Sequence, residues 1–172
     1  MVGISGICDQ AAGRFSAIHS VLWDDGVPTD IGDLGGVAWN TPMAINKRGD
    51  IVGFANASAA DGGSFNPRAV VWFKGQGIRN LGTLRDDPTS TSQALGINKR
   101  GQIVGQSCDA EGNCRAFLWQ TGVMLDLNQL VASGYDDLLT TANDIDDHGR
   151  ITGQAYDDET SQFVAFLANP DR

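Results

Sequence analysis

Hydrophobic residues along the chain recur in short runs separated by polar turns, without the 3.6-residue spacing of an amphipathic helix. In the run that begins at Ile51, Ile51 and Gly53 would face one side of a strand, and Val52 and Phe54 the other. The preceding tetrapeptide, 46–49, reads Asn-Lys-Arg-Gly, which suits a type I turn followed by a left-handed glycine. The pattern predicts a β-hairpin here and an all-β chain with no substantial helix.

This hairpin pattern occurs three times, as Ile-Asn-x-x-Gly-x-Ile-Val-Gly from Ile45 and Ile97, and in a looser form from Ile145. Spacing near fifty residues is typical of a repeat architecture. We expect the recurring residues to be structural positions set by backbone geometry, with Lys47, Arg48, Lys99 and Arg100 as exposed corners of the turns. The recurring structural positions are Asn46, Gly49, Gly53, Asn98, Gly101, Gly105, Gly149 and Gly153.

A second recurring pattern is an apolar strand that ends in tryptophan, followed by a glycine turn and a leucine-rich strand. Trp23, Trp72 and Trp119 are equivalent in this pattern, and Ala168 takes the same position in a clipped fourth copy. Stacking on a sugar is one interpretation of these indoles, but their regular recurrence favours packing between repeats. Trp39 lies outside this register, before a predicted strand, and is a weak candidate for a ligand-binding surface.

Each full unit contains four predicted strands, so the chain holds about fourteen. The units cover approximately 1–35, 36–87, 88–134 and 135–172, within a single repeat domain. One four-stranded unit cannot bury its apolar face alone, so we expect the units to stack as a β-propeller-like array of about 3.5 to 4 blades. The first unit lacks its first strand and the last unit lacks its fourth, so one chain could close a ring by joining the two, or a second copy could complete it.

These motifs resemble the HAF-repeat family of bacterial extracellular repeat proteins, named for a His-Ala-Phe tripeptide. The resemblance covers essentially the whole chain: Arg115-Ala116-Phe117 and Val164-Ala165-Phe166 keep two of the three residues, and His19 keeps the histidine. It implies a propeller-like fold, an extracellular or periplasmic location and no established catalytic activity. The chain departs from the family pattern because it has no signal peptide and few repeats, so we expect an N-terminally shortened member.

The composition of the chain argues against two classes of binding partner. The chain of 172 residues has a formal net charge of −9, which argues against binding to nucleic acid or to an anionic membrane surface. No apolar run approaches the roughly 20 residues that cross a bilayer, so we expect no membrane insertion.

Cys108 and Cys114 flank the predicted hairpin loop CDAEGNC and would form a disulfide in an oxidising compartment. Two free thiols in a reducing cell are the alternative. Metal binding is disfavoured because no second Cys/His pair completes a set of four ligands. We interpret Cys8 as a small buried residue.

Two acidic clusters offer the oxygen ligands that calcium binds, but neither has EF-hand spacing, and solvated turn chemistry explains them better. Their members are Asp144, Asp146 and Asp147, and then Asp157, Asp158 and Glu159. A general base near neutral pH would have to be His19 or His148, which occupy different kinds of position. The segment Gly3-Ile4-Ser5-Gly6 has the wrong spacing for a nucleophile elbow. We therefore predict no catalytic residue, no metal and no cofactor.

The sequence thus predicts a non-catalytic extracellular repeat protein, a binding or structural scaffold for an unidentified protein or carbohydrate ligand. One alternative is a secreted propeller hydrolase that uses loop carboxylates, such as Asp24 or Asp25 in the turn WDDG. Another is a propeller fragment that assembles with a second copy.

Overall fold

The structure is a computed structural model, and it describes residues 1–6, 17–57, 66–132 and 134–170. This described part contains fourteen β-strands and one short 3-10 helix. The strands form four antiparallel sheets, two with three strands and two with four. The predicted all-β fold is confirmed.

Each sheet is a meander whose strands follow chain order. The first sheet holds β1 (Val2–Gly6), β2 (Ala17–Asp24) and β3 (Val27–Asp30). The second holds β4 (Thr41–Ile45), β5 (Ile51–Asn56), β6 (Pro67–Phe73) and β7 (Gly77–Gly82). The third holds β8 (Thr91–Ile97), β9 (Ile103–Cys108), β10 (Cys114–Gln120) and β11 (Val123–Asp126), which leads into the 3-10 helix Leu127–Gln129. The fourth holds β12 (Leu138–Ile145), β13 (Ile151–Asp157) and β14 (Gln162–Ala168).

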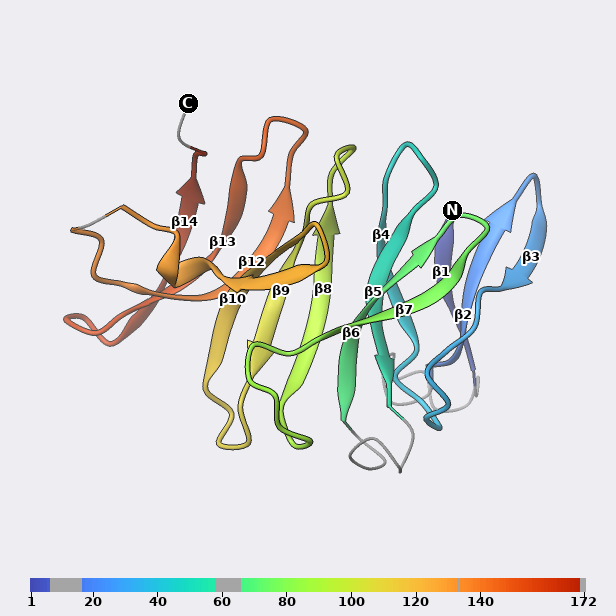
Figure 1. Cartoon of the computed structure of the whole chain (residues 1–172), viewed down its shortest axis with the longest axis horizontal. Helices are drawn as coiled ribbons and strands as arrows, with labels where there is room; N and C mark the ends of the chain where they lie inside the picture. The colour runs from blue at the N-terminus through green and yellow to red at the C-terminus, as the bar shows by residue number, and fades with distance from the viewer. Residues whose placement is uncertain (7–16, 58–65, 133, 171–172) are drawn as a thin grey trace.

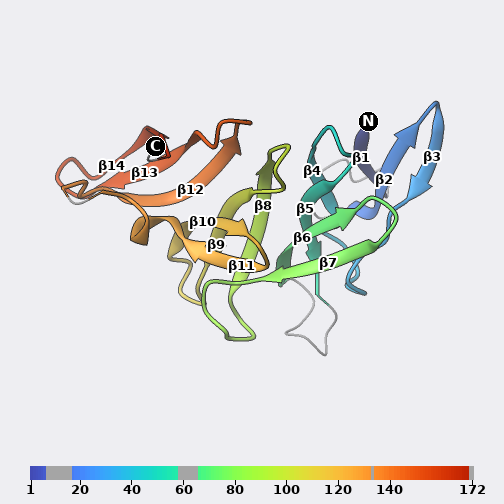
Figure 2. The same ribbon diagram turned by 45° about the horizontal axis from the view of Figure 1, so that its top comes forward.

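The four sheets stand in a row in chain order, each beside its neighbour in sequence (Figure 1). Figure 2 shows the same order from a second direction. The first and the last sheet lie at opposite ends of this row, so the two do not join to close a ring in this structure. The physical reason is that three interfaces between successive sheets do not turn the row far enough to bring its ends together.

Apolar side chains fill each of the three interfaces. Strand alternation divides neighbouring residues between interfaces: Ile51 packs toward the first sheet, whereas Val52 packs toward the third. This is the two-sided pattern expected for the run that begins at Ile51. The interface between the second and third sheets joins Val52, Ala69, Val71 and Leu81 to Ala94, Ile97, Ile103, Phe117 and Trp119. The interface between the third and fourth joins Val104, Ala116, Leu118 and Leu127 to Leu139, Ala142, Ile145, Ile151 and Ala155.

A β-bulge recurs between the first two strands of the second, third and fourth sheets, just before the turn. It brings a carbonyl oxygen of the first strand against the glycine of Ile-Val-Gly, leaving no room for a Cβ atom. The distances from an ideal Cβ to that oxygen are 2.0 Å for Gly53 and Thr41, 1.9 Å for Gly105 and Gln93, and 2.0 Å for Gly153 and Thr141. The recurring glycine is therefore required by close backbone approach.

We expect Gly105→Ala to lower the free energy of unfolding by at least about 3 kcal/mol, because the new methyl group would overlap the carbonyl oxygen of Gln93. Gly112→Ala is the matched control, since Gly112 has a φ of +86° but open space around its Cβ position. The control should lose only about 1 kcal/mol, from backbone strain. Urea unfolding measures both variants, and equal losses would contradict this account of the repeat.

Candidate functional site

The turns between the first two strands of successive sheets are linked by asparagine side chains. The Asn46 Oδ1 atom accepts hydrogen bonds from the backbone nitrogens of Arg48 at 2.9 Å and Asp50 at 3.1 Å, which shapes the turn. Its Nδ2 atom donates to the carbonyl oxygen of Asn98 in the next sheet at 3.2 Å. The Nδ2 atom of Asn98 donates in turn to the carbonyl oxygen of Asp146 at 3.0 Å. We call this series of bonds the asparagine ladder.

Asp146 occupies the third position of the ladder with a different side chain. Its Oδ1 atom accepts from the backbone nitrogens of His148 and Arg150, both at 2.9 Å, so it shapes its turn as asparagine does. These bonds, led by the Arg150 backbone amide and reinforced by the Arg150 guanidinium, lower the pKa of Asp146 well below its usual range. A carboxylate has no N–H group, so this residue cannot donate to a further turn.

The left-handed glycines of the three turns have φ values of +85° at Gly49, +79° at Gly101 and +89° at Gly149. The arginines before them are exposed, as predicted, and Arg48 and Arg100 also contact the turn of the next sheet. The guanidinium of Arg48 lies over Gly101 of the next turn, and that of Arg100 lies over Gly149. Successive turns stack closely, and each arginine covers the turn that follows it.

A lysine and an aspartate also connect two turns. The backbone nitrogen of Lys99 donates to Asp147 Oδ1 at 2.9 Å, and the Lys99 ammonium lies 3.8 Å from Asp147 Oδ2. Lys99 is therefore another corner that contacts the next sheet. The backbone bond is the main reason that the pKa of Asp147 is lowered.

We expect Asn98→Asp to lower the free energy of unfolding by about 2 kcal/mol. The variant keeps the Oδ1 acceptor of the turn but loses the donor to Asp146, and it places a carboxylate where the Asn98 residue is only 2% exposed. Asp146→Asn is the matched control and should change stability by less than about 0.5 kcal/mol, because the second oxygen of Asp146 contacts only the exposed side chains of Arg150 and His148. Thermal and urea unfolding compare the two, and a neutral Asn98→Asp would contradict the ladder's role.

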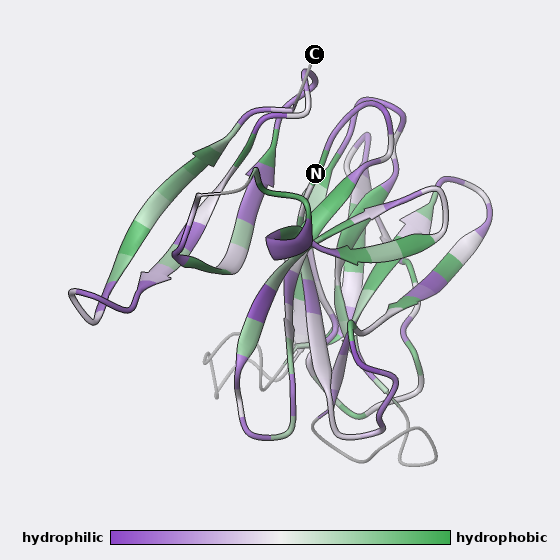
Figure 3. Cartoon of the chain, turned by 60° about the vertical axis from the view of Figure 1, so that its left-hand side comes forward, coloured by the Kyte–Doolittle hydropathy of each residue, from purple (hydrophilic) through white to green (hydrophobic). Residues whose placement is uncertain are grey.

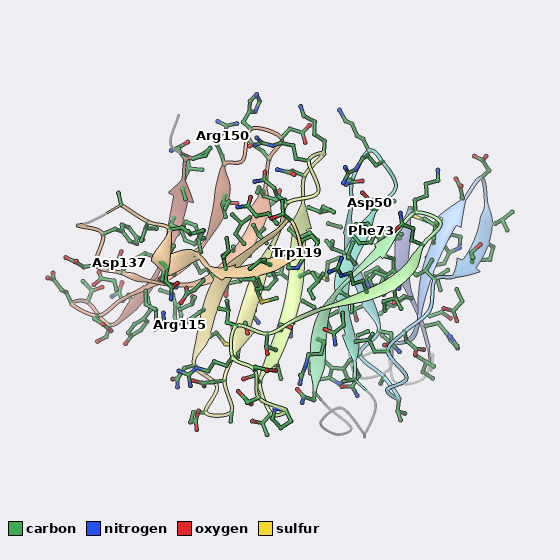
Figure 4. The ribbon with its side chains drawn as sticks, in the orientation of Figure 1. Asp50, Phe73, Arg115, Trp119, Asp137 and Arg150 are labelled. Carbon is green, nitrogen blue, oxygen red and sulfur yellow. A yellow bond between two sulfur atoms is a disulfide. The ribbon has the colours of Figure 1, made fainter. Side chains whose placement is uncertain are left out.

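The recurring tryptophans lie in register. Trp72 faces Ile51 on the neighbouring strand and Trp119 faces Ile103, and the two tryptophans are 3% and 6% exposed. Trp72 packs between the first and second sheets, where its Nε1 atom donates to the carbonyl oxygen of Gly32 at 3.0 Å. Trp119 packs between the second and third sheets (Figure 4). The geometry of these two indoles is that of inter-sheet packing.

Trp23 differs from the other two because it belongs to the first sheet, with no preceding sheet in the described part of the chain. Its side chain is partly exposed. Strand alternation places it on the same face as His19 and Val21, the face turned away from the second sheet.

Trp39 lies in the segment that leads into β4 and has a φ of +68°. Its ring packs at a tilt against Phe54 of β5, with 6.3 Å between ring centroids, and the residue is partly buried. Part of this indole therefore contributes to the protein's own packing. A ligand contact at Trp39 stays a prediction.

A disulfide joins Cys108 and Cys114, which face each other at the ends of β9 and β10. Both cysteines line a polar groove of about 670 Å³, which also holds two ion pairs. Arg85 lies 3.4 Å from Asp109, and Arg115, marked in Figure 4, lies 3.0 Å from Asp126. We call this feature the ion-pair groove.

The charges in the ion-pair groove are already matched. A backbone hydrogen bond from Asn113 is the main cause that lowers the pKa of Asp109, and the Arg85 charge adds to it. With its carboxylates and guanidiniums paired, the groove offers hydrogen-bonding groups to a neutral polar ligand more readily than a binding site for an isolated ion.

We expect mass spectrometry of the unreduced, denatured protein to find one alkylated thiol, that of Cys8, and three after reduction. Cys8 lies outside the described residues. Replacing both Cys108 and Cys114 by serine should lower the free energy of unfolding by about 2 kcal/mol, since the disulfide closes a short loop. Cys8→Ser is the control. Two or three reactive thiols in protein purified under oxidising conditions would refute the pairing.

The acidic residues and histidines that were candidates for catalysis or metal binding do not lie together in one site. His19 pairs with Asp30 at 2.7 Å in the first sheet, and His148 lies in a turn of the last sheet, at the other end of the row. Asp24 and Asp25 lead into the tight turn between β2 and β3. The Asp157 carboxylate accepts hydrogen bonds from backbone nitrogens of its own turn, and so does that of Asp146. The Asp144 carboxylate accepts a hydrogen bond from the backbone nitrogen of the next residue. Within the described ranges, no group of three or more His, Cys, Asp or Glu side chains is arranged to hold a metal ion.

No helix in the described part of the chain is long and apolar enough to cross a membrane. Searches of protein-family models, curated proteins and solved structures found no match to this chain.

Sequence reasoning missed the asparagine ladder and the ion-pair groove. The change from Asn to Asp at position 146 was visible, but its significance depends on the stacking of turns. The groove is lined by residues from three predicted units, so no local sequence motif predicts it.

Proposed function

We propose that the protein is a non-catalytic extracellular scaffold, a propeller-like array related to the HAF-repeat proteins, that associates through its two end sheets. The resemblance in sequence supports the family and the location. The observation that carries the proposal is that the recurring residues are used for contacts between sheets, while Trp23 on the first sheet and Leu167 on the last lie on faces that no further sheet covers in the described part of the chain.

The outer face of the last sheet is the first of these end faces. Leu167 is equivalent by repeat to Val71 and Leu118, which are buried in the two interfaces ahead of it. Leu167 is 59% exposed, and Phe163 on the same strand is 67% exposed. Figure 3 brings this sheet forward and shows hydrophobic residues along β14.

The outer face of the first sheet is the complementary one. It carries Trp23, equivalent to the inter-sheet tryptophans, and Pro28, which faces Trp23 on the neighbouring strand and is exposed. Stacking the last sheet of one copy onto the first sheet of another would repeat the existing interface. Such a contact joins two different surfaces, so it builds a closed ring or a filament.

The ion-pair groove is the best-supported surface for the unidentified protein or carbohydrate ligand, because its paired charges favour neutral polar groups. The hydrolase alternative has less support. Its proposed carboxylates lie in the first sheet, Asp24 at the end of β2 and Asp25 in the turn that follows, away from the ion-pair groove built mainly on the third sheet.

Sedimentation velocity over the micromolar to millimolar range tests the association. We expect the mean mass to rise with concentration, and Leu167→Glu and Pro28→Glu each to limit that rise by placing a charge on one end face. Val123→Glu is the control, since Val123 is exposed but is the first residue of β11 in the third sheet, away from both end faces. Circular dichroism verifies that each variant is folded.

Mixing the two end-face variants separates this contact from a symmetric one. Leu167→Glu keeps an intact first sheet and Pro28→Glu an intact last sheet, so an equimolar mixture should form dimers that neither variant forms alone. A monomer at every concentration, or a mixture that does not associate, would overturn the proposed assembly.

A further inference from the structure

The fourth sheet has alanine where the other sheets have tryptophan. Ala168 faces Ile151 across β14 and β13, as Trp72 faces Ile51 and Trp119 faces Ile103. In the two preceding interfaces the indole fills the space between sheets. Between the third and fourth sheets this indole is missing.

The surroundings of the missing indole are nevertheless retained. Around Trp119, the inter-sheet core includes Val71, Leu81, Ile97, Ile103 and Phe117. Their repeat equivalents around Ala168 are Leu118, Leu127, Ile145 and Ile151, which belong to the core between the third and fourth sheets, and Phe166, which is partly buried against that core. The residues that would surround a tryptophan side chain are therefore present, but the tryptophan itself is replaced by alanine.

A pocket of about 540 Å³ lies at this place, and all five of these residues and Ala168 line it. Its volume falls within the range of about 300–1,000 Å³ that small-molecule sites occupy. Leu130 also lines the pocket and is 50% exposed, whereas its repeat equivalents Leu34 and Leu84 pack against their clusters. The empty space thus extends to the surface.

Polar groups lie at the boundary of this apolar pocket. Arg100 and Gln102 line it from the third sheet, and Tyr135 lines it from the segment before β12. An apolar body with a few polar groups at its edge is the usual composition of a site for a small organic ligand. In the filled site of Trp119, the guanidinium of Arg79 lies 5.5 Å from the ring centroid, so cationic side chains already accompany an aromatic ring in this repeat.

We propose that this pocket, the Ala168 pocket, binds a planar aromatic small molecule of about the size of an indole ring. The ligand would take the place that the protein's own indole takes in the preceding interfaces. Its flat faces would contact the aliphatic side chains of the two sheets. Ligand binding at this pocket does not depend on association between copies, so its test is independent of the test of the proposed function.

Titration of the protein with indole tests the pocket directly. We expect saturable binding by isothermal titration calorimetry and shifts of the methyl NMR signals of Leu118 and Ile151. Ala168→Trp should supply the missing ring within the chain. It should raise the melting temperature by several degrees and weaken indole binding at least about tenfold.

Ala165→Trp is the matched control, because Ala165 is on the same strand but on the exposed opposite face. It should leave indole binding unchanged. The reverse variant, Trp119→Ala, should open the equivalent space between the second and third sheets and lower the melting temperature, with partial recovery on addition of indole.

Three results would overturn the proposal. One is the absence of saturable indole binding to the wild-type chain. Another is indole binding that Ala168→Trp leaves unchanged while that variant remains folded, since the ligand would then bind elsewhere. A destabilised Ala168→Trp variant would also count against the pocket, because it would show that the space does not accept an indole.

Discussion

Burial of apolar faces between successive sheets is the interaction on which the rest of the structure depends. Each sheet has three or four strands and cannot remove both of its apolar faces from water alone. Alternation along β5 sends Ile51 to one neighbouring sheet and Val52 to the other, so an internal sheet is stabilised from both sides. The bulge glycine and the asparagine ladder both serve this packing. The glycine lets the first two strands approach at a bulge, and the ladder aligns the turns of adjacent sheets.

The differences between repeats are more informative about function than the repeated residues. Repeated residues such as Trp72 and Asn98 make contacts between neighbouring sheets. The departures lie mainly in the third and fourth units: the disulfide between Cys108 and Cys114, Asp146 in the ladder, and alanine at position 168. A scaffold built by repetition acquires specific surfaces where one copy departs from the pattern, because there the common packing leaves a group or a space unused.

Much of the local structure could be predicted from the sequence, because it depends on residues close together in the chain. Alternation and the turn signal at Asn46 to Gly49 indicated the strands and hairpins, and the tryptophan register indicated which positions pack against a neighbouring unit. The bulge explains why Gly105 recurs, but sequence reasoning assigned that glycine only a general backbone role. Arg48 and Arg100 are exposed as predicted, but their contacts with the next turn were not predicted, because the turn that each covers belongs to another unit.

The sequence by itself determined the all-β class, the repeat units and the residues that each strand turns toward its neighbours. These properties follow from side-chain alternation and turn chemistry, which act over a few residues. Only the tertiary structure decided that the row of sheets stays open, that the asparagine side chains connect successive turns, and that the missing indole at Ala168 leaves a pocket. Those properties depend on the angle and distance between sheets, which are set by the packing of side chains about fifty residues apart.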